Sequence, residues 1–266
     1  PGNEENVNLY IIRHGQTDMN VLHRMQGRTD TRLNEKGRQQ AREAAKFLKK
    51  EKIVPDRVIV SPLDRARETA EIVSGRPRDL QEPDDRIIEM CFGEAEGKPN
   101  EELAQGFYES FFRTVVDYEP PDGAESYEDL FDRIADFVED LRDQYVLCAN
   151  RGAVVSDCEE PVQEDAGECH IRKDRRCQDR KTGPTIFVVS HGAALHALLA
   201  YVGHVERKDF WKIDVNNCAV FQVFLSDQKR EPDGRPGSDY QDHFTRLYEG
   251  FGHGHYLNMT AQIDRK

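Results

Sequence analysis

Short hydrophobic runs alternate with amphipathic segments along the chain. The runs at 9–12, 56–62, 185–192 and 217–225 are rich in β-branched and aromatic residues, which is typical of buried strands. Helix formers with an apolar face occupy 33–52, 63–75, 101–117 and 126–145, and an apolar helix is expected at 193–203. A last strand is expected at 244–249. This alternation predicts an α/β fold, a three-layer sandwich with a largely parallel central sheet flanked by helices.

One segment, 148–184, breaks the rhythm. Its first half is acidic, its second half contains the basic stretch HIRKDRRCQDRK (170–181), and it has little periodicity. With 266 residues, of which 37% are hydrophobic, we expect a single domain spanning 1–266 with an irregular insertion at about 148–184. The insertion is interpreted as surface decoration, and the alternative is a lid or docking segment.

The overall charge narrows the possible partners. A net charge of −13 disfavours nucleic acid and anionic membrane as partners, because both need a basic face. A small anionic metabolite remains possible, since a local group of arginines can outweigh a distant acidic surface. No apolar run approaches the roughly 18 residues of a membrane span, and residues 1–8 lack the layout of a signal peptide. A cytoplasmic protein is therefore expected.

The cysteines do not indicate a metal site. There are six, and no two of them form a CxxC pair: Cys91, Cys148, Cys158, Cys169, Cys177 and Cys218. The four between 148 and 177 lie near His170, but their spacing fits no common zinc-ligand pattern, so free thiols are expected. Cys169 and Arg175 show the Cys-x5-Arg spacing of cysteine phosphatases, but neither a glycine-containing loop nor a preceding strand accompanies it, so this match is interpreted as chance.

Two of the predicted strands end in a histidine followed by glycine. The first ends in Arg13-His14-Gly15 and the third in Ser190-His191-Gly192. In open α/β sheets ligands bind beyond the carboxyl ends of the strands, so these side chains are expected to face one crevice. Gly15 is expected to supply backbone angles at the turn that other residues avoid.

A third polar motif follows the second strand. SPLDRARETA (61–70) places Arg65 and Arg67 in the first turns of a helix, where positive charge opposes the helix dipole. A bound anion would compensate them. We therefore expect Arg13, Arg65, His14 and His191 to surround one tetrahedral dianion.

These residue types favour phosphoryl transfer without a metal. The chain contains no phosphate loop, HExxH or GxSxG motif. A neutral imidazole is a competent nucleophile toward phosphorus, and arginines neutralise the phosphoryl oxygens. A carboxylic acid would protonate the leaving group. Glu89 is well placed for that role, with Glu94 and Glu96 as alternatives.

These motifs together resemble the histidine phosphatase superfamily, in its phosphoglycerate-mutase-like branch. They are RHGQTDMN (13–20), QGRTDTRLNEKGRQQA (26–41), SPLDRARETA (61–70), IIEMCFGEAEG (87–97) and VVSHG (188–192). The resemblance covers roughly 8–97 and 185–225. Ala95 departs from it, because many relatives carry an aromatic residue there, so the resemblance does not predict the shape of the pocket.

The resemblance also implies a role for each site residue, with no cofactor and no metal. His14 would be the phosphorylated nucleophile and Glu89 the proton donor. The implied phosphate binders are Arg13, Arg65 and His191. The residues implied to assist in substrate binding are Asn20, Gln26, Gly27 and Gly192.

Within this family the sequence favours a phosphatase over a mutase. The segment 92–106 is short and acidic, whereas cofactor-dependent mutases carry a longer one with a basic clamp. A mutase must keep water from its phosphohistidine, which a short cap would not do. The layout is similar to TIGAR-type fructose-2,6-bisphosphatases, which implies a substrate such as fructose 2,6-bisphosphate or 2,3-bisphosphoglycerate. The alternatives are a broad-specificity phosphomonoesterase, a mutase, or a regulatory protein that binds phosphorylated ligands.

Overall fold

A mixed six-stranded sheet forms the centre of the computed structural model, which describes residues 7–103, 107–112, 115–147, 184–226, 231 and 242–251. The strands are β1 (Asn8–Arg13), β2 (Arg57–Val60), β3 (Glu82–Pro83), β4 (Thr185–Ser190), β5 (Val220–Phe224) and β6 (His243–Tyr248). Their order is β3-β2-β4-β1-β5-β6. The first four in this order are parallel, β5 is antiparallel to β1, and β6 is antiparallel to β5.

The helices are α1 (Asp18–Val21), α2 (Glu35–Lys50), α3 (Asp64–Ser74), α4 (Phe107–Phe112), α5 (Tyr127–Leu141) and α7 (Gly192–Gly203). Short 3₁₀ turns occupy Arg78–Leu80, Asp85–Ile87, Gly93–Ala95, Asn100–Glu102, Val115–Asp117 and Arg207–Lys212. A π-helical stretch, Arg142–Leu147, continues α5.

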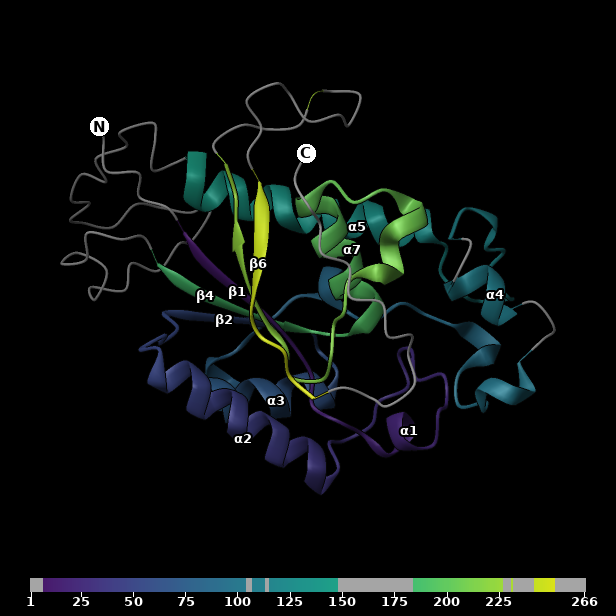
Figure 1. Cartoon of the computed structure of the whole chain (residues 1–266), viewed down its shortest axis with the longest axis horizontal. Helices are drawn as coiled ribbons and strands as arrows, with labels where there is room; N and C mark the ends of the chain where they lie inside the picture. The colour runs from purple at the N-terminus through teal and green to yellow at the C-terminus, as the bar shows by residue number, and fades with distance from the viewer. Residues whose placement is uncertain are drawn as a thin grey trace, which may run out of the picture.

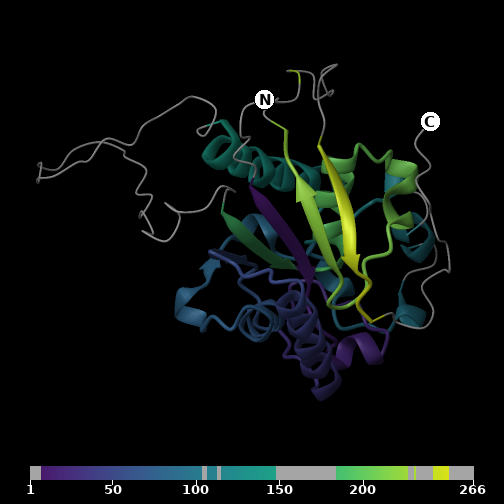
Figure 2. The same ribbon diagram turned by 60° about the vertical axis from the view of Figure 1, so that its left-hand side comes forward.

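The sheet is covered on both faces, as the sequence predicts. Helices α2 and α3 lie on one side and α5 and α7 on the other (Figure 1), and the turned view in Figure 2 shows the same layering. Alternate residues of β1 point to opposite sides: Ile12 packs with Ala44 of α2, and Ile11 packs in the core that contains Leu198 of α7. The expected three-layer α/β sandwich is therefore confirmed.

Three of the predicted helices carry capping residues at one end. Asn34 caps α2 by accepting a hydrogen bond from Gly37 N, and Gly75 ends α3 in the left-handed conformation. Ser126 and Asp129 form a capping box at the start of α5. The two-residue strand β3 was not predicted, and Pro83 cannot donate to a longer ladder.

The continuous helix expected over 101–117 is wrong. The described part of this segment contains the 3₁₀ turn Asn100–Glu102, the six-residue α4 and the turn Val115–Asp117. Packing of the aromatic side chains accounts for the break. Phe107 and Phe111 both contact Tyr118, with ring centroids 5.9 and 5.2 Å away, which a continuous helix with a rise of about 1.5 Å per residue would not allow.

Several predictions fall on residues that the structure does not describe. Of the predicted insertion only Pro184 is described, so the domain prediction stays a prediction. Cys148, Cys158, Cys169 and Cys177 also lie outside the described residues, whereas Cys91 and Cys218 are free thiols. Within the described ranges, no group of three or more His, Cys, Asp or Glu could hold a metal ion. No helix of the described chain is long and apolar enough to cross a membrane.

Candidate active site

The carboxyl ends of β2, β4 and β1 lie next to one another, which brings three polar residues together. Val189 of β4 is paired with Ile12 of β1 on one side and with Val60 of β2 on the other. Each strand is followed at once by a polar side chain: His14 after β1, Ser61 after β2 and His191 after β4. The two imidazole centroids are 5.1 Å apart. The two histidines therefore lie side by side at one edge of the sheet, as expected, but only His14 faces the cavity described next.

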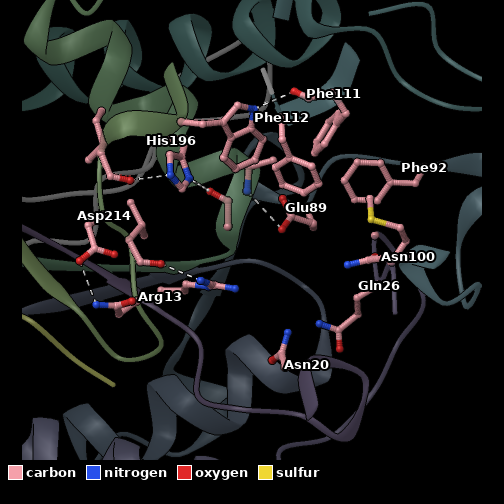
Figure 3. A pocket seen from close by; sticks show the side chains of 18 of the residues that line it. Arg13, Asn20, Gln26, Glu89, Phe92, Asn100, Phe111, Phe112, His196 and Asp214 are labelled. Atoms are coloured by element: carbon pink, nitrogen blue, oxygen red, sulfur yellow. Dashed lines mark hydrogen bonds between the residues drawn. The ribbon is translucent and has the colours of Figure 1, made fainter. Parts of the chain in front are cut away.

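A cavity of about 520 Å³ opens beside these strand ends. Its polar lining includes Arg13, His14, Asn20, Gln26, Gly27, Glu89 and Gly192. Seven of the nine site residues predicted from the sequence thus line one cavity, and Figure 3 shows Arg13, Asn20, Gln26 and Glu89 around it. The other two, Arg65 and His191, lie behind the cavity and are fully buried.

His14 is held in a defined tautomer. Its Nδ1 lies 2.7 Å from the Gly15 carbonyl oxygen. A carbonyl can only accept, so Nδ1 carries the proton and Nε2 of the neutral ring keeps its lone pair. The backbone on either side is also fixed, since Asn217 Nδ2 donates to the His14 carbonyl and Gly15 N donates to Thr69 Oγ1.

Gly15 is required for a different reason from the one expected. It is not among the residues with positive φ. A Cβ at Gly15 would lie 2.5 Å from the carbonyl oxygen of Gly37, and a Cβ at Gly37 would lie 2.1 Å from that of Gln16. The two glycines therefore allow the turn after β1 to press against the first turn of α2.

Arg65 and His191 form a buried hydrogen-bonded chain. Arg65 Nε donates to His191 Nδ1 over 3.1 Å, so the single N–H of this ring is on Nε2, which lies 2.6 Å from Ser61 Oγ. Arg65 also donates to the carbonyls of Gly27 and Thr29. Protein carbonyls, and not only a bound anion, thus compensate this arginine at the start of α3. Arg67 turns away from the cavity and donates to the Arg78 carbonyl.

Burial disfavours the protonated form of two histidines, His191 behind the cavity and His196 in its lining. It lowers the pKa of His191 well below its ordinary value, and the adjacent Arg65 adds to the effect. Burial likewise lowers the pKa of His196 to about 4. For Arg65 burial lowers the pKa to about 10 despite the nearby charge of Glu89, so this guanidinium stays cationic at neutral pH.

Of the three acidic candidates, only Glu89 lines the cavity. Its carboxylate accepts hydrogen bonds from the backbone N–H groups of Met90, Ala193 and Ala194, the last two in the first turn of α7. A Cβ added to Gly192 would lie 3.5 Å from Glu89 Oε2, so this glycine leaves the space beside the carboxylate open.

The two other acids do not reach the cavity. Glu94 is exposed on a 3₁₀ turn. Glu96 accepts hydrogen bonds from Phe92 N, Arg28 N and both donors of Thr29. Burial opposes ionisation of Glu96, but these hydrogen bonds outweigh it and lower the pKa of the carboxyl. Glu96 therefore holds the loop around Arg28 in place.

Two amides face Glu89 across the cavity. Asn20 Oδ1 accepts from Thr17 N, and Gln26 Oε1 accepts from the hydroxyls of Thr17 and Thr31. With their oxygens occupied, both side chains turn an NH₂ group toward the centre of the cavity (Figure 3). Arg13 is held by the segment that precedes β5, because its Nη1 donates to the Val215 carbonyl over 2.6 Å.

Sequence reasoning missed the residues that support this site. Ser61 stood inside a quoted motif, directly after a strand, and could have been found there. Thr69 lies in the same motif, but Thr69 and Asn217 act only through backbone atoms brought close by the fold, so their residue types give no signal. In the apolar part of the cavity, Phe92 lies in the motif 87–97, whereas Phe112 and Trp211 belong to no motif.

Comparison with known proteins agrees with this geometry. The model of the histidine phosphatase superfamily (branch 1) matches residues 9–156 and 167–233. The metal-independent phosphoserine phosphatase of Arabidopsis thaliana is 32% identical over 231 residues, which cover 85% of this chain and 79% of that protein. Phosphoglycerate mutase 1 of Saccharomyces cerevisiae is 29% identical over 233 residues, covering 84% of this chain and 89% of that one.

A solved structure shows the same fold. Bacillus stearothermophilus YhfR superposes with a TM-score of 0.63 at 26% identity, and the match covers 92% of this chain and 96% of that one. The family model spans well over half of the chain and includes all nine residues singled out from the sequence. The chain therefore belongs to the histidine phosphatase superfamily (branch 1) and is an enzyme.

Proposed function

We propose that this enzyme hydrolyses small phosphate monoesters through a phosphohistidine intermediate on His14, without a metal ion. The observation that carries the proposal is the tautomer of His14. Because Nδ1 donates to the Gly15 carbonyl, it is Nε2 that carries the lone pair when the ring is neutral, in a cavity that also presents Glu89 and Arg13. An unprotonated imidazole nitrogen is what attack on phosphorus requires.

The two chemical steps follow from these positions. His14 Nε2 forms a bond to phosphorus while the bond to the ester oxygen breaks, and Glu89 in its protonated form gives that oxygen a proton. Water then attacks the phosphohistidine, Glu89 takes a proton from it, and inorganic phosphate leaves. Arg13 and the amides of Asn20 and Gln26 would bind the phosphoryl oxygens during both steps.

Arg65 and His191 remain proposed phosphate binders, but His191 would have to give up its hydrogen bond to Ser61. In the structure the Nε2–H of His191 is directed at Ser61, and Arg65 donates to His191 and two carbonyls. Bound phosphate would compete with Ser61 for the His191 proton. Arg65 would act mainly by holding His191 and by placing a buried positive charge behind the phosphate.

Hydrolysis is favoured over mutase activity by the walls of the cavity. The described part of the segment after Glu89 consists of short turns, tied back by hydrogen bonds between Met25, Gly97 and Lys98. Of the cations that line the cavity besides Arg13, Arg24 donates to the Gly97 carbonyl. The other three pair with carboxylates: Arg207 with Glu128, Lys208 with Glu206 and Lys212 with Asp209. A mutase must hold a doubly phosphorylated intermediate, and these paired cations do not form a strong second anion site.

The specificity predicted from the layout, a TIGAR-type preference for fructose 2,6-bisphosphate, stays a prediction. The same paired cations weigh against a bisphosphate. Relatives with phosphatase and with mutase names both match this chain. A phosphatase of monoesters is therefore the function that the site supports best, and a mutase is the second candidate.

The test is phosphate release from a panel of sugar phosphates, phosphoserine and phosphoglycerates, with a mutase assay alongside. His14→Ala should lower kcat by about a thousandfold or more, and rapid quenching of the native enzyme should trap an acid-labile, base-stable phosphoprotein. His243→Gln, an exposed histidine on edge strand β6, serves as the matched control. Full activity in His14→Ala would refute the mechanism. A rate lost in chelator and restored by Zn²⁺ or Mg²⁺ would refute metal independence.

A further inference from the structure

The cavity has two chemically different halves. One half presents Arg13, Asn20, Gln26 and Glu89. The other part, which we call the aromatic half, is formed chiefly by Phe92, Phe112, Val115, Trp211 and Ile213. The cavity lining also includes three cations, each paired with a carboxylate: Arg207, Lys208 and Lys212. Figure 3 shows Phe92 and Phe112 next to Glu89, across the cavity from Asn20. The phosphoryl chemistry described above uses only the polar half.

The aromatic half is held rigidly. Trp211 Nε1 lies 2.9 Å from the Phe111 carbonyl, to which it donates, and 3.0 Å from Tyr127 Oη. The Phe112 ring packs against Trp211 and Phe111, with centroids 4.9 and 4.7 Å apart. Because these rings are fixed before any ligand arrives, little conformational entropy is lost when a ligand packs on them.

This half still has apolar surface to bury. Phe111 is 1% exposed and serves as backing, whereas Phe112 and Trp211 are only partly buried although both line the cavity. A ligand that covers their exposed area gains hydrophobic free energy that a polyhydroxylated ligand does not gain.

The position of Glu89 says which part of a substrate meets these rings. This step rests on the proposed function, in which Glu89 protonates the ester oxygen of the leaving alcohol. The leaving alcohol must then lie on the Glu89 side of the phosphorus, where Phe92 and Phe112 are found (Figure 3).

We infer that the aromatic half is a leaving-group subsite, and that the enzyme prefers phosphate monoesters of apolar, ring-bearing alcohols over phosphorylated sugars. Phe112 and Trp211 supply its contact surface, and Phe92 closes it beside Glu89. An apolar leaving group would occupy the aromatic half of the cavity, which a small hydrophilic substrate would leave empty.

The kinetic test uses a matched pair, benzyl phosphate and glucose 6-phosphate. Both are esters of a primary alcohol on a six-membered ring, so the leaving groups differ mainly in polarity. We expect kcat/KM to be about tenfold higher for benzyl phosphate. Phe112→Ser should bring the ratio of the two kcat/KM values close to one, and Phe112→Leu should retain part of the preference.

The control is Leu80→Ala, which removes an apolar side chain of comparable size outside the cavity, where Leu80 is 56% exposed. It should leave the ratio unchanged. Equal kcat/KM values for the two esters in the native enzyme would overturn the subsite while leaving the phosphatase intact.

A binding measurement separates failure of the subsite from failure of the chemistry. Trp211 is the only tryptophan of the chain, so its fluorescence reports directly on this wall. Benzylphosphonate, which cannot be hydrolysed, should change that fluorescence and bind about tenfold more tightly than methylphosphonate. Equal affinities would overturn the subsite. If neither ester is hydrolysed but benzylphosphonate binds selectively, the proposed function fails and the subsite stands.

Discussion

Single hydrogen bonds determine the protonation of the key side chains in this site. The Gly15 carbonyl selects the proton position on His14, and Arg65 Nε selects it on His191. The carboxylate of Glu89 is positioned by two backbone N–H groups at the start of α7. The proposed chemistry therefore depends on neighbouring groups that accept or donate hydrogen bonds but do not themselves react.

The first prediction at the residue scale concerns Glu89. Glu89→Gln removes the proton that a poor alkoxide leaving group needs, so kcat should fall far more for glucose 6-phosphate than for p-nitrophenyl phosphate, whose leaving group needs little help. Glu94→Gln, at an exposed carboxylate outside the cavity, is the control. An equal loss on both substrates in Glu89→Gln would argue against a general-acid role.

A second prediction concerns His196, whose ring nitrogens lie 2.7 Å from the Gly192 carbonyl and 2.8 Å from the Ile213 carbonyl. Burial lowers its pKa from 6.5 to about 4 in the folded protein and outweighs the two carbonyls, which only accept and therefore favour the protonated ring. Between these values the unfolded chain binds a proton that the folded chain does not, so stability falls as pH falls. This group should cost up to about 3 kcal/mol between pH 6.5 and 4.

Denaturant titrations of the native protein and His196→Gln across that range measure the effect. The free energy of unfolding should depend less steeply on pH in the variant, and the two slopes should coincide above pH 7. If both proteins lose stability in parallel between pH 6.5 and 4, His196 does not carry this linkage.

At the scale of elements, the site depends on how closely the turn after β1 approaches α2. Gly15 and Gly37 meet without side chains, and Gln40 Oε1 accepts from Gln16 N beside them. The same turn carries His14, so the contact between a strand end and a helix start sets the position of the nucleophile.

Gly15→Ala tests this contact. The new Cβ would lie 2.5 Å from a backbone carbonyl that cannot move aside cheaply, so we expect a loss of about 1–3 kcal/mol and a large fall in kcat. Gly75→Ala is the matched control, since nothing lies within 4 Å of its Cβ and only its positive φ is unfavourable. It should cost about 1 kcal/mol with activity retained. Full activity in Gly15→Ala would show that the approach is not required.

At the scale of the whole molecule, a buried ion pair connects parts that are distant in sequence. Arg142, directly after α5, pairs with Asp242, directly before β6, and both side chains are fully buried. Arg142 also donates to the Ser226 carbonyl, and Asp242 accepts from Ser226 N. The pair thus joins the end of α5 to the strands β5 and β6.

Removing one partner should be costly, because the other charge stays buried and loses its main compensation, although Glu139 Oε2 still accepts from Arg142 Nε over 3.2 Å. Arg142→Met or Asp242→Asn should lower the free energy of unfolding by about 3–5 kcal/mol. The double variant should lose less than the sum of the two single losses, as a double-mutant cycle in denaturant would show. Additive losses would mean that the two charges do not interact.

Local patterns were sufficient to predict what depends on neighbours in sequence. The strands that end at Arg13 and Ser190, the left-handed end of α3 at Gly75 and the capping box at Ser126 follow from hydrophobic periodicity and capping chemistry. Because parallel strands present their carboxyl ends at one edge, the meeting of His14 and His191 could also be predicted. The hydrophobic pattern predicted a continuous helix over 101–117 wrongly, because aromatic packing there outweighed helical propensity.

Only the tertiary structure decided what depends on residues far apart in the chain. Arg65 and His191 are separated by 126 positions in the sequence, and their hydrogen bond, which withdraws both from the cavity, is visible only when β2 and β4 lie side by side. The same holds for Gly15 against Gly37 and for Trp211 against Phe112. The sequence by itself determined the chemical groups and the strand ends that carry them. Packing determined which groups face the cavity, because close approach and burial are properties of the folded chain.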